Sequence, residues 1–337
     1  MGALCQPRRL DVPKRAGSAI RRSARDSRAA RSCHAPARRS EARKRAVYCA
    51  VVSRAGAGGD RPQARSIELN LGVAPIEYDG DAMLDSDWFA NGVAMQRWWT
   101  ERTLRAAGTS DSVVPFALRT FVLGASYSPA ANDISISRIL LRPPFFDAAL
   151  PAPINFARLG AIYGHEIGHS VDRQSRFHPA GGGFSRWWRE GTMAGIEARE
   201  ECVSTIYTEK LRDFVPEEIA RDPRQLSRLV ERSAREALAD HIGLRSALAA
   251  LREWQKQQPS VEAIAGWSPE QAFFLAYSQL WCQSPTSVAE DLQALHAVHP
   301  PGPARINAAL ATLPEFGEAF GCAVGSKMRP LTQCVTP

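Results

Sequence analysis

The chain has 337 residues, of which 45% are hydrophobic and 23% charged, and its formal net charge is +7. This length and composition exclude a disulfide-dependent miniprotein, a collagen-like chain and wholesale disorder, and they allow one large domain or two ordinary ones. The positive net charge raises nucleic acid or an acidic membrane as possible partners, so its distribution along the chain matters.

The first segment, residues 1–65, holds the excess positive charge. It contains 17 Lys and Arg against four acids, with Ala, Ser and Gly between the arginines and few aromatic or β-branched residues. We therefore expect it to be a disordered extension. Its apolar run at 46–52 is short and late for a secretory signal. No stretch of 18 apolar residues occurs anywhere in the sequence, so we expect no membrane span in this chain.

Beyond residue 65 the patterns are those of a globular domain. Alternation at 67–71 and 135–137 predicts short strands, and an apolar stripe at 88–107 predicts a helix. Five further segments have helical composition and are separated by Pro, Gly or Asp: 156–172, 190–212, 224–256, 269–282 and 302–312. We find no internal repeat and no second linker, so residues 66–337 are predicted to form one mainly helical domain with a small sheet near its start.

The strongest motif is an HExxH pattern formed by His165, Glu166 and His169. Positions four apart differ by about 40° around a helix, so both histidines project from one face and can offer a ring nitrogen to one ion. Glu166 lies beside that ion without binding it, which suits a general base that takes a proton from zinc-bound water. Chance yields roughly 0.01 such patterns in a chain of this composition. The alternative is a surface helix that happens to carry two histidines.

A catalytic zinc site needs a third protein ligand, and Glu236 is the best candidate. It lies in an apolar helical stretch, where a buried acid is costly unless it meets a cation. Asp240, one turn later, is placed to accept a hydrogen bond from the free ring N–H of a ligating histidine. The alternative for this pair is the solvated acidic edge of an ordinary helix.

Several separated blocks follow one another in a recognisable order. They are ASYSP at 125–129, LRPPFFD at 141–147, GHEIGHSVD at 164–172, WW at 187–188, EALAD at 236–240, FFL and QLWC at 273–282, and HPPG with Arg305 at 299–305. Through these blocks, residues from about 70 to 334 resemble the catalytic domain of the neprilysin and endothelin-converting-enzyme family of zinc metallopeptidases. The resemblance implies an α+β, mainly helical fold: a thermolysin-like zincin catalytic domain with a small β-sheet and an HExxH helix.

The resemblance also implies a zinc-dependent metalloendopeptidase that cleaves peptides or small proteins and binds one Zn²⁺ per chain. It assigns zinc ligation to His165, His169 and Glu236, general-base catalysis to Glu166, oxyanion stabilisation to His299, support of the zinc ligands to Asp172 and Asp240, and substrate contacts to Ala125 and Arg305. Cys202 and Cys334 match positions that pair in the family, which favours a periplasmic or secreted location.

Two departures from the family pattern suggest an alternative. Gly124 stands where the family has an Asn before Ala125, so one amide that would position a peptide is missing. We also expect the family's N-terminal lid domain to be absent from this chain, unless a separate chain supplies it. The alternative is therefore a truncated or degenerate member that binds zinc with little or no peptidase activity. Nucleic-acid binding is not expected, because the basic segment lacks interleaved aromatic residues or a recognition fold.

Overall fold

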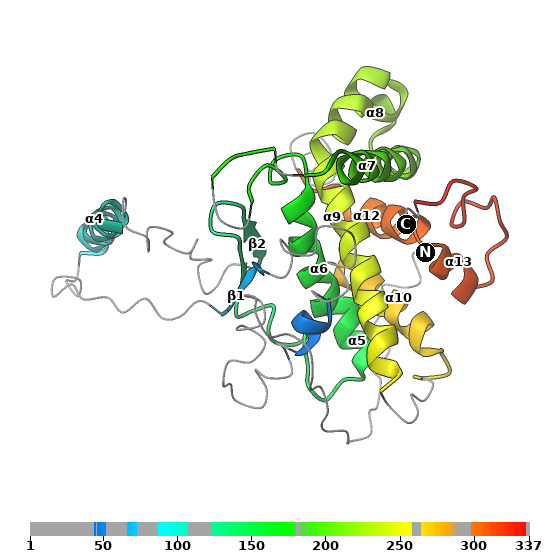
Figure 1. Ribbon diagram of the computed structural model, residues 1–337, viewed down its shortest axis with the longest axis horizontal. Helices are drawn as coiled ribbons and strands as arrows, with labels where there is room; N and C mark the ends of the chain where they lie inside the picture. Colours follow the sequence, from blue (N-terminus) through cyan, green and yellow to red (C-terminus); the bar gives the residue numbers. More distant parts are fainter. Residues whose placement is uncertain are drawn as a thin grey trace.

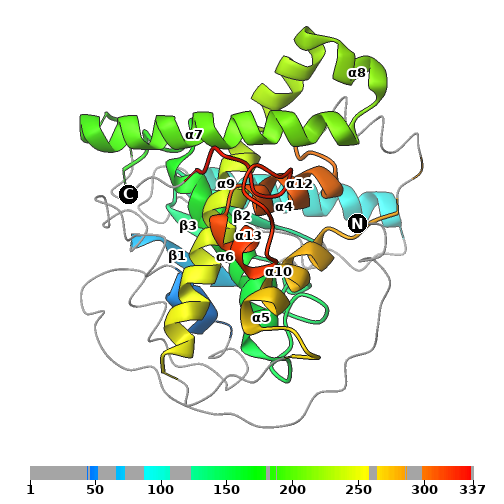
Figure 2. The ribbon, with the colours of Figure 1, turned by 90° about the vertical axis from the view of Figure 1, so that its right-hand side faces the viewer.

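The computed structural model has a long helix at its centre. That helix, α9 (Pro223–Gln255), runs beside α6 (Ala161–Gly168) (Figure 1). Figure 2 shows that α7 (Glu190–Leu211) lies across one end of this pair. The residues that the structure describes are 44, 46–51, 66–72, 87–106, 123–179, 183–186, 188–257, 264–284, 286 and 298–334.

A small mixed sheet precedes these helices. Its strands are β1 (Glu68–Leu71), β2 (Ala125–Ser128) and β3 (Asp133–Ile136), in the order β1-β3-β2. The central strand, β3, is parallel to β1 and antiparallel to β2, and all four of its residues are buried. The strand β2 is therefore an edge strand of this sheet. The strands predicted at 67–71 and 135–137 overlap β1 and β3.

The HExxH pattern lies in an irregular but continuous helical segment. The short helix α5 (Ala152–Asn155) leads through a π-helical turn (Phe156–Gly160) into α6, and a 3-10 turn (His169–Val171) follows. Most of the side chains in α5 and in the π-helical turn are buried. The tighter last turn carries the second histidine of the pattern. The helix predicted at 156–172 overlaps this segment, which ends one residue earlier, at Val171.

The helix α9 begins at a side-chain cap and packs tightly on α6. Asp222 Oδ1 accepts hydrogen bonds from the backbone N–H groups of Arg224 and Gln225, as an N-cap residue does. Where the two helices meet, a Cβ added to Gly164 would lie 2.7 Å from Gly243 Cα. Only a residue without a Cβ fits at this contact. The two backbones therefore approach closely enough for side chains of α9 to reach the HExxH face.

The described residues include other helices besides these. They are α4 (Trp88–Ala106), α8 (Glu217–Arg221), α10 (Pro269–Leu280), α12 (Gly302–Ala311) and α13 (Pro314–Ala319). The predicted helical segments correspond to α4, to α6 with its flanking turns, and to α7, α9, α10 and α12, whereas the short α8 and α13 were not predicted. Within the described part of the chain, no helix is both long enough and apolar enough to cross a lipid bilayer.

Part of the segment expected to be disordered belongs to the core. Residues 46–51 are helical, and Val47, Tyr48 and Val51 are buried in the main hydrophobic cluster. The Tyr48 ring packs edge-to-face on Tyr163 of α6, with 5.4 Å between ring centroids. The expectation of disorder is therefore wrong for residues 46–51, because their apolar side chains cover the back of the HExxH helix. The rest of residues 1–65 lies outside the described residues, apart from Lys44.

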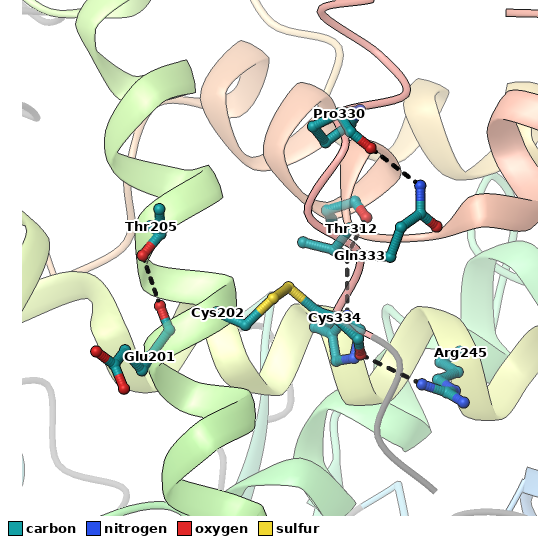
Figure 3. The surroundings of a disulfide bond; sticks show 10 residues. Glu201, Cys202, Thr205, Arg245, Thr312, Pro330, Gln333 and Cys334 are labelled. Atoms are coloured by element: carbon teal, nitrogen blue, oxygen red, sulfur yellow. Dashed lines mark hydrogen bonds between the residues drawn. A yellow bond between two sulfur atoms is a disulfide. The ribbon is translucent and has the colours of Figure 1, made fainter. Parts of the chain in front are cut away.

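A disulfide bond joins α7 to the C-terminal segment, as the resemblance implied. Figure 3 shows Cys202 of α7 bonded to Cys334, whose carbonyl oxygen accepts a hydrogen bond from Arg245 Nη1 at 3.4 Å. The bond spans 132 positions of sequence, and Cys334 is buried. Closing a loop of this length stabilises the fold by on the order of 5 kcal/mol in the chain-entropy model. The bond holds α7 and the end of the chain together.

Candidate metal centre and active site

The two histidines of the HExxH pattern lie on one face of their helix. His165 is in the last turn of α6, and His169 begins the 3-10 turn that follows. Their Nε2 atoms are 3.1 Å apart, as expected for residues one helical turn apart. Both imidazole rings can therefore address a single ion.

A carboxylate lies behind each histidine ring. His165 Nδ1 is 2.8 Å from Asp240 Oδ1, and His169 Nδ1 is 3.0 Å from Asp172 Oδ2. Since an ionised carboxylate can only accept hydrogen bonds, each Nδ1 carries the proton and donates it. In the neutral form of each ring the lone pair is then on Nε2, and the two Nε2 atoms face each other. This arrangement of carboxylate, histidine and open nitrogen is typical of metal-binding histidines.

Glu236 of α9 brings a carboxylate oxygen to these two nitrogens. Its Oε2 lies 3.2 Å from His165 Nε2 and 3.6 Å from His169 Nε2, and it is buried without a hydrogen-bond partner. Ligand atoms about 2.0–2.1 Å from a tetrahedral zinc ion are about 3.3 Å from one another. The separations of these three atoms, 3.1–3.6 Å, therefore fit the ligands of one zinc ion.

The charge state of Glu236 agrees with a role as ligand. Burial by itself raises the pKa of this carboxyl, but its contacts with His165, His169 and His299 outweigh burial and hold the pKa well below its usual range. The group is therefore an anion. A buried anion is costly unless a cation compensates it, and an ion bound between Glu236 and the two histidines would do so.

His299 is the third histidine near Glu236. Its Nε2 lies 2.9 Å from Glu236 Oε2 without forming a hydrogen bond, and the donor atoms of His165, Glu236 and His299 all lie within 4.8 Å of one another. However, its side chain is 50% exposed, and no carboxylate among the described residues contacts its Nδ1. His169 has such a carboxylate partner, so we prefer His169 as the ligand. His299 stands at the mouth of the site.

Glu166 lies beside the three candidate ligands but is not one of them. It is buried, and burial is the main reason that its pKa is raised above the ordinary value for a glutamate. A carboxylate with a raised pKa takes up a proton more readily near neutral pH. The position and environment of Glu166 therefore suit a general base.

Arg305 is held inside the fold, against Asp240. Its Nε and Nη2 donate to the two carboxylate oxygens of Asp240 at 2.7 and 2.6 Å, and its guanidinium lies 3.7 Å from the centroid of the Trp281 ring. Burial alone would raise the pKa of Asp240, but the charge of Arg305 lowers it to about 2. The resemblance assigned Arg305 to the substrate, and in this structure its guanidinium supports the carboxylate behind His165.

Arg235, which no sequence pattern predicts as a site residue, contacts the other supporting carboxylate. Its Nε and Nη2 each lie 2.8 Å from Asp172 Oδ2. The only sequence signal was its position directly before Glu236, and such adjacency by itself does not predict which partner a long side chain reaches. Arg235 and Arg305 thus place a cation behind each of the two carboxylates.

Ala125 begins the edge strand β2, which packs near α6. The other edge of β2 is not paired with any described strand. The outer strand of a sheet can bind an extended peptide through backbone hydrogen bonds. The substrate contact predicted for Ala125 remains a prediction, and Gly124 provides no side-chain amide beside it.

His241 is a buried histidine on α9 that the candidate site does not use. Its Nδ1 donates to Thr312 Oγ1 at 2.8 Å, because the Thr312 hydroxyl itself donates to Ala309 O. Burial first, and then the charges of Arg199 and Arg245, lower the pKa of His241 to about 3. The ring is therefore neutral in the folded protein at neutral pH.

We expect His241 to make the folded protein sensitive to acid. In the unfolded chain a histidine titrates near pH 6.5, so below that pH the unfolded state takes up a proton that the folded state does not. The free energy of unfolding then falls, by roughly 2 kcal/mol at pH 5 from this residue. Urea denaturation of the zinc-free protein at pH 7.5 and pH 5 measures the loss, which should be smaller by that amount in His241→Asn. An equal loss in both proteins would contradict the expectation.

Comparison with known proteins identifies the family. The model of peptidase family M13 matches residues 124–336, which is more than half of the chain. The chain belongs to peptidase family M13. An endothelin-converting enzyme homolog of Locusta migratoria is 27% identical over 268 residues, and neprilysin-1 of Caenorhabditis elegans is 34% identical over 219 residues.

These M13 relatives are much longer than the region they share with this chain. The matches cover 79% and 64% of this chain but only 35% and 28% of the two relatives. This chain therefore corresponds to about a third of each of them. An activity like that of the full-length relatives is therefore only proposed for this protein, in the next subsection.

Solved structures share the M13 fold. The zinc metalloprotease Zmp1 of Mycobacterium tuberculosis, in complex with an inhibitor, superposes with a TM-score of 0.71 at 20% identity, over 88% of this chain and 47% of that one. PepO from Lactobacillus rhamnosis has a TM-score of 0.67 at 18% identity, over 91% of this chain and 48% of that one. The predicted fold class, an α+β and mainly helical zincin domain, is confirmed.

Proposed function

We propose that this M13 chain is a zinc-dependent metalloendopeptidase domain that hydrolyses peptide bonds of peptides or small proteins. The observation that supports it most directly is the convergence of three potential ligand atoms, His165 Nε2, His169 Nε2 and Glu236 Oε2, at separations of 3.1–3.6 Å. These three residues are the proposed zinc ligands, with one Zn²⁺ per chain. Zinc, when bound, supplies Lewis acidity to the attacking water and to the scissile carbonyl.

The neighbouring side chains suit the proton transfers of hydrolysis. Glu166 accepts the proton that water loses as its oxygen attacks the carbonyl carbon, and then delivers it to the nitrogen of the leaving amine. Its burial and raised pKa favour both steps. His299, half exposed at the mouth, donates a hydrogen bond to the oxygen that gains negative charge.

The substrate is proposed to bind as an added strand. An extended peptide that adds a strand beside β2 at Ala125 would run beside the helix that carries the two histidine ligands. Backbone hydrogen bonds of this kind recognise any extended peptide and carry little sequence preference. Peptides are therefore the proposed substrate class. Arg305 is proposed to act through its hydrogen bonds to Asp240.

We further propose that residues 46–51 and 66–334 form one catalytic unit that works outside the cytoplasm. The burial of Val47, Tyr48 and Val51 against the core supports the inclusion of the earlier segment. The disulfide between Cys202 and Cys334, together with the disulfide-bonded state of Cys49 and Cys282, supports an oxidising compartment.

The proposal is tested by metal analysis and a peptide assay on the full chain. Protein equilibrated with zinc and then dialysed should retain about one zinc per chain. It should cleave a mixture of internally quenched peptides, and a chelator should stop the cleavage until zinc is returned. One bound zinc with no cleavage of any peptide would favour the alternative of a zinc-binding module. A chain that binds no zinc would contradict both.

A further inference from the structure

Asp172 is buried and fully occupied by partners. Its Oδ1 accepts hydrogen bonds from the backbone N–H groups of Gln174 and Ser175, at 2.8 and 2.9 Å. Its Oδ2 receives His169 Nδ1 at 3.0 Å, and Arg235 Nε and Nη2 at 2.8 Å each. The oxygen that holds the zinc-ligand ring is therefore the same oxygen that Arg235 holds.

Each histidine ring is held by a carboxylate that is itself held by an arginine, but the helices that supply the carboxylate and the arginine differ between the two. Behind His165, the carboxylate of Asp240 belongs to α9 and its cation, Arg305, to α12. Behind His169, the carboxylate of Asp172 follows the HExxH helix and the cation comes from α9. Each support thus ties α9 to the helix that carries the histidines.

We propose that Arg235 is a positioning residue of the zinc site, which fixes Asp172 Oδ2, and through it the His169 ring, relative to Glu236. This inference rests on the proposed zinc function. Arg235 and Glu236 are consecutive residues of α9, so the guanidinium moves together with the carboxylate ligand. The contact with Asp172 therefore sets the distance between two ligands that come from different helices. A site whose ligands are held in place before the ion arrives binds it more tightly.

The turn that carries Asp172 does not depend on Arg235 for its fold. Glu200 of α7 is buried and lies 2.5 Å from Arg173 Nε and 3.8 Å from Arg176 Nη2, so it holds the turn from the other side. The side chain of Arg235 is 30% exposed, and water can replace part of its contacts. A substitution at Arg235 therefore frees Asp172 Oδ2 without removing the turn.

A positioning role and a purely electrostatic role of Arg235 predict opposite changes in zinc affinity when Arg235 is replaced. A positive charge near the site repels Zn²⁺, so removing that charge alone would tighten zinc binding. Removing a contact that fixes the position of His169 relative to Glu236 weakens zinc binding instead. The direction of the change therefore separates the two roles.

The test compares the zinc affinity of five full-length variants with that of the wild type, by competition with a chromophoric chelator. Partners behind a metal ligand are worth about 10–100-fold in metal affinity, and Arg235 acts one residue further out. We expect Arg235→Gln to bind zinc about 3–10-fold more weakly and Arg235→Lys to recover part of the loss. Arg228→Gln, which changes an exposed arginine two turns earlier on α9, should bind zinc as the wild type does. Circular dichroism of the zinc-free proteins checks that all of them fold.

The fourth and fifth variants, Asp172→Asn alone and combined with Arg235→Gln, provide the control for mechanism. If Arg235 acts through Asp172, the effect of Arg235→Gln should largely disappear in the Asp172→Asn background. Unchanged or tighter zinc binding by Arg235→Gln would overturn the inference, as would an equal loss in both backgrounds. Zinc binding without peptide cleavage by the wild type would count against the proposed function alone, and no zinc binding at all would overturn both.

Discussion

Replacement of Glu166 by Gln is expected to reduce peptide hydrolysis by roughly 10²–10⁴-fold while zinc stays bound. Glutamine has almost the same shape as glutamate, but its amide cannot accept the proton of the attacking water. Because Glu166 is not one of the three proposed zinc ligands, the change leaves His165, His169 and Glu236 in place. Zinc content and kcat/KM, measured on the same preparation, check both halves of the expectation.

A matched control comes from α7. Glu197 is exposed and has no place in the proposed chemistry, so Glu197→Gln removes the same charge and should retain both zinc and activity. If Glu166→Gln hydrolysed peptides at the wild-type rate, Glu166 would not be the base and the mechanism proposed above would fail. If it lost its zinc as well, Glu166 would be part of the metal site rather than a neighbour of it.

Replacement of Glu236 by Gln is expected to weaken zinc binding by at least about 100-fold, more than the loss of an outer partner of a ligand. The amide oxygen keeps the shape of the side chain but removes the anion that the three nearby histidines stabilise. Binding to the folded state alone raises its stability, by about 4 kcal/mol at a zinc concentration 1,000 times the Kd. Added zinc should therefore raise the Tm of the wild type and hardly change that of Glu236→Gln.

Glu231 supplies the control for this prediction. It lies on the same helix, five residues earlier, and is exposed. Glu231→Gln should show the full rise in Tm with zinc. If zinc raised the Tm of Glu236→Gln as much as that of the wild type, Glu236 would not be a ligand, and His299, which lies within reach of the same cluster, would take its place as the third candidate.

The resemblance to a peptidase family predicted the fold class, and local sequence patterns predicted the main helices. Helical composition located α7, α9, α10 and α12 because each is long, amphipathic or well bounded by Pro and Gly. The short helices α8 and α13 were not predicted, since a segment of five or six residues is too short to show a helical periodicity. The boundary at residue 65 failed at 46–51, because a short apolar run among arginines looks like disorder until a core is present to bury it.

The candidate site divides in the same way. The two histidines and Glu166 lie within five residues, and the geometry of a helix alone places them together. Glu236 follows 67 residues after His169, and no local pattern fixes such a distance in space; only the resemblance singled it out firmly. Arg235 had no signal at all, because the partner of a flexible side chain depends on what packs around it.

By itself, the sequence determined the chemistry of the HExxH face and the set of residues that could join it. Helical periodicity is local, so it survives without knowledge of the rest of the chain. The tertiary structure alone decided that Gly164 and Gly243 let α6 and α9 approach until a carboxylate of α9 reaches both histidine nitrogens. It also decided which cation stands behind each supporting carboxylate, because contacts between helices depend on packing across the whole core and are not contained in any one segment.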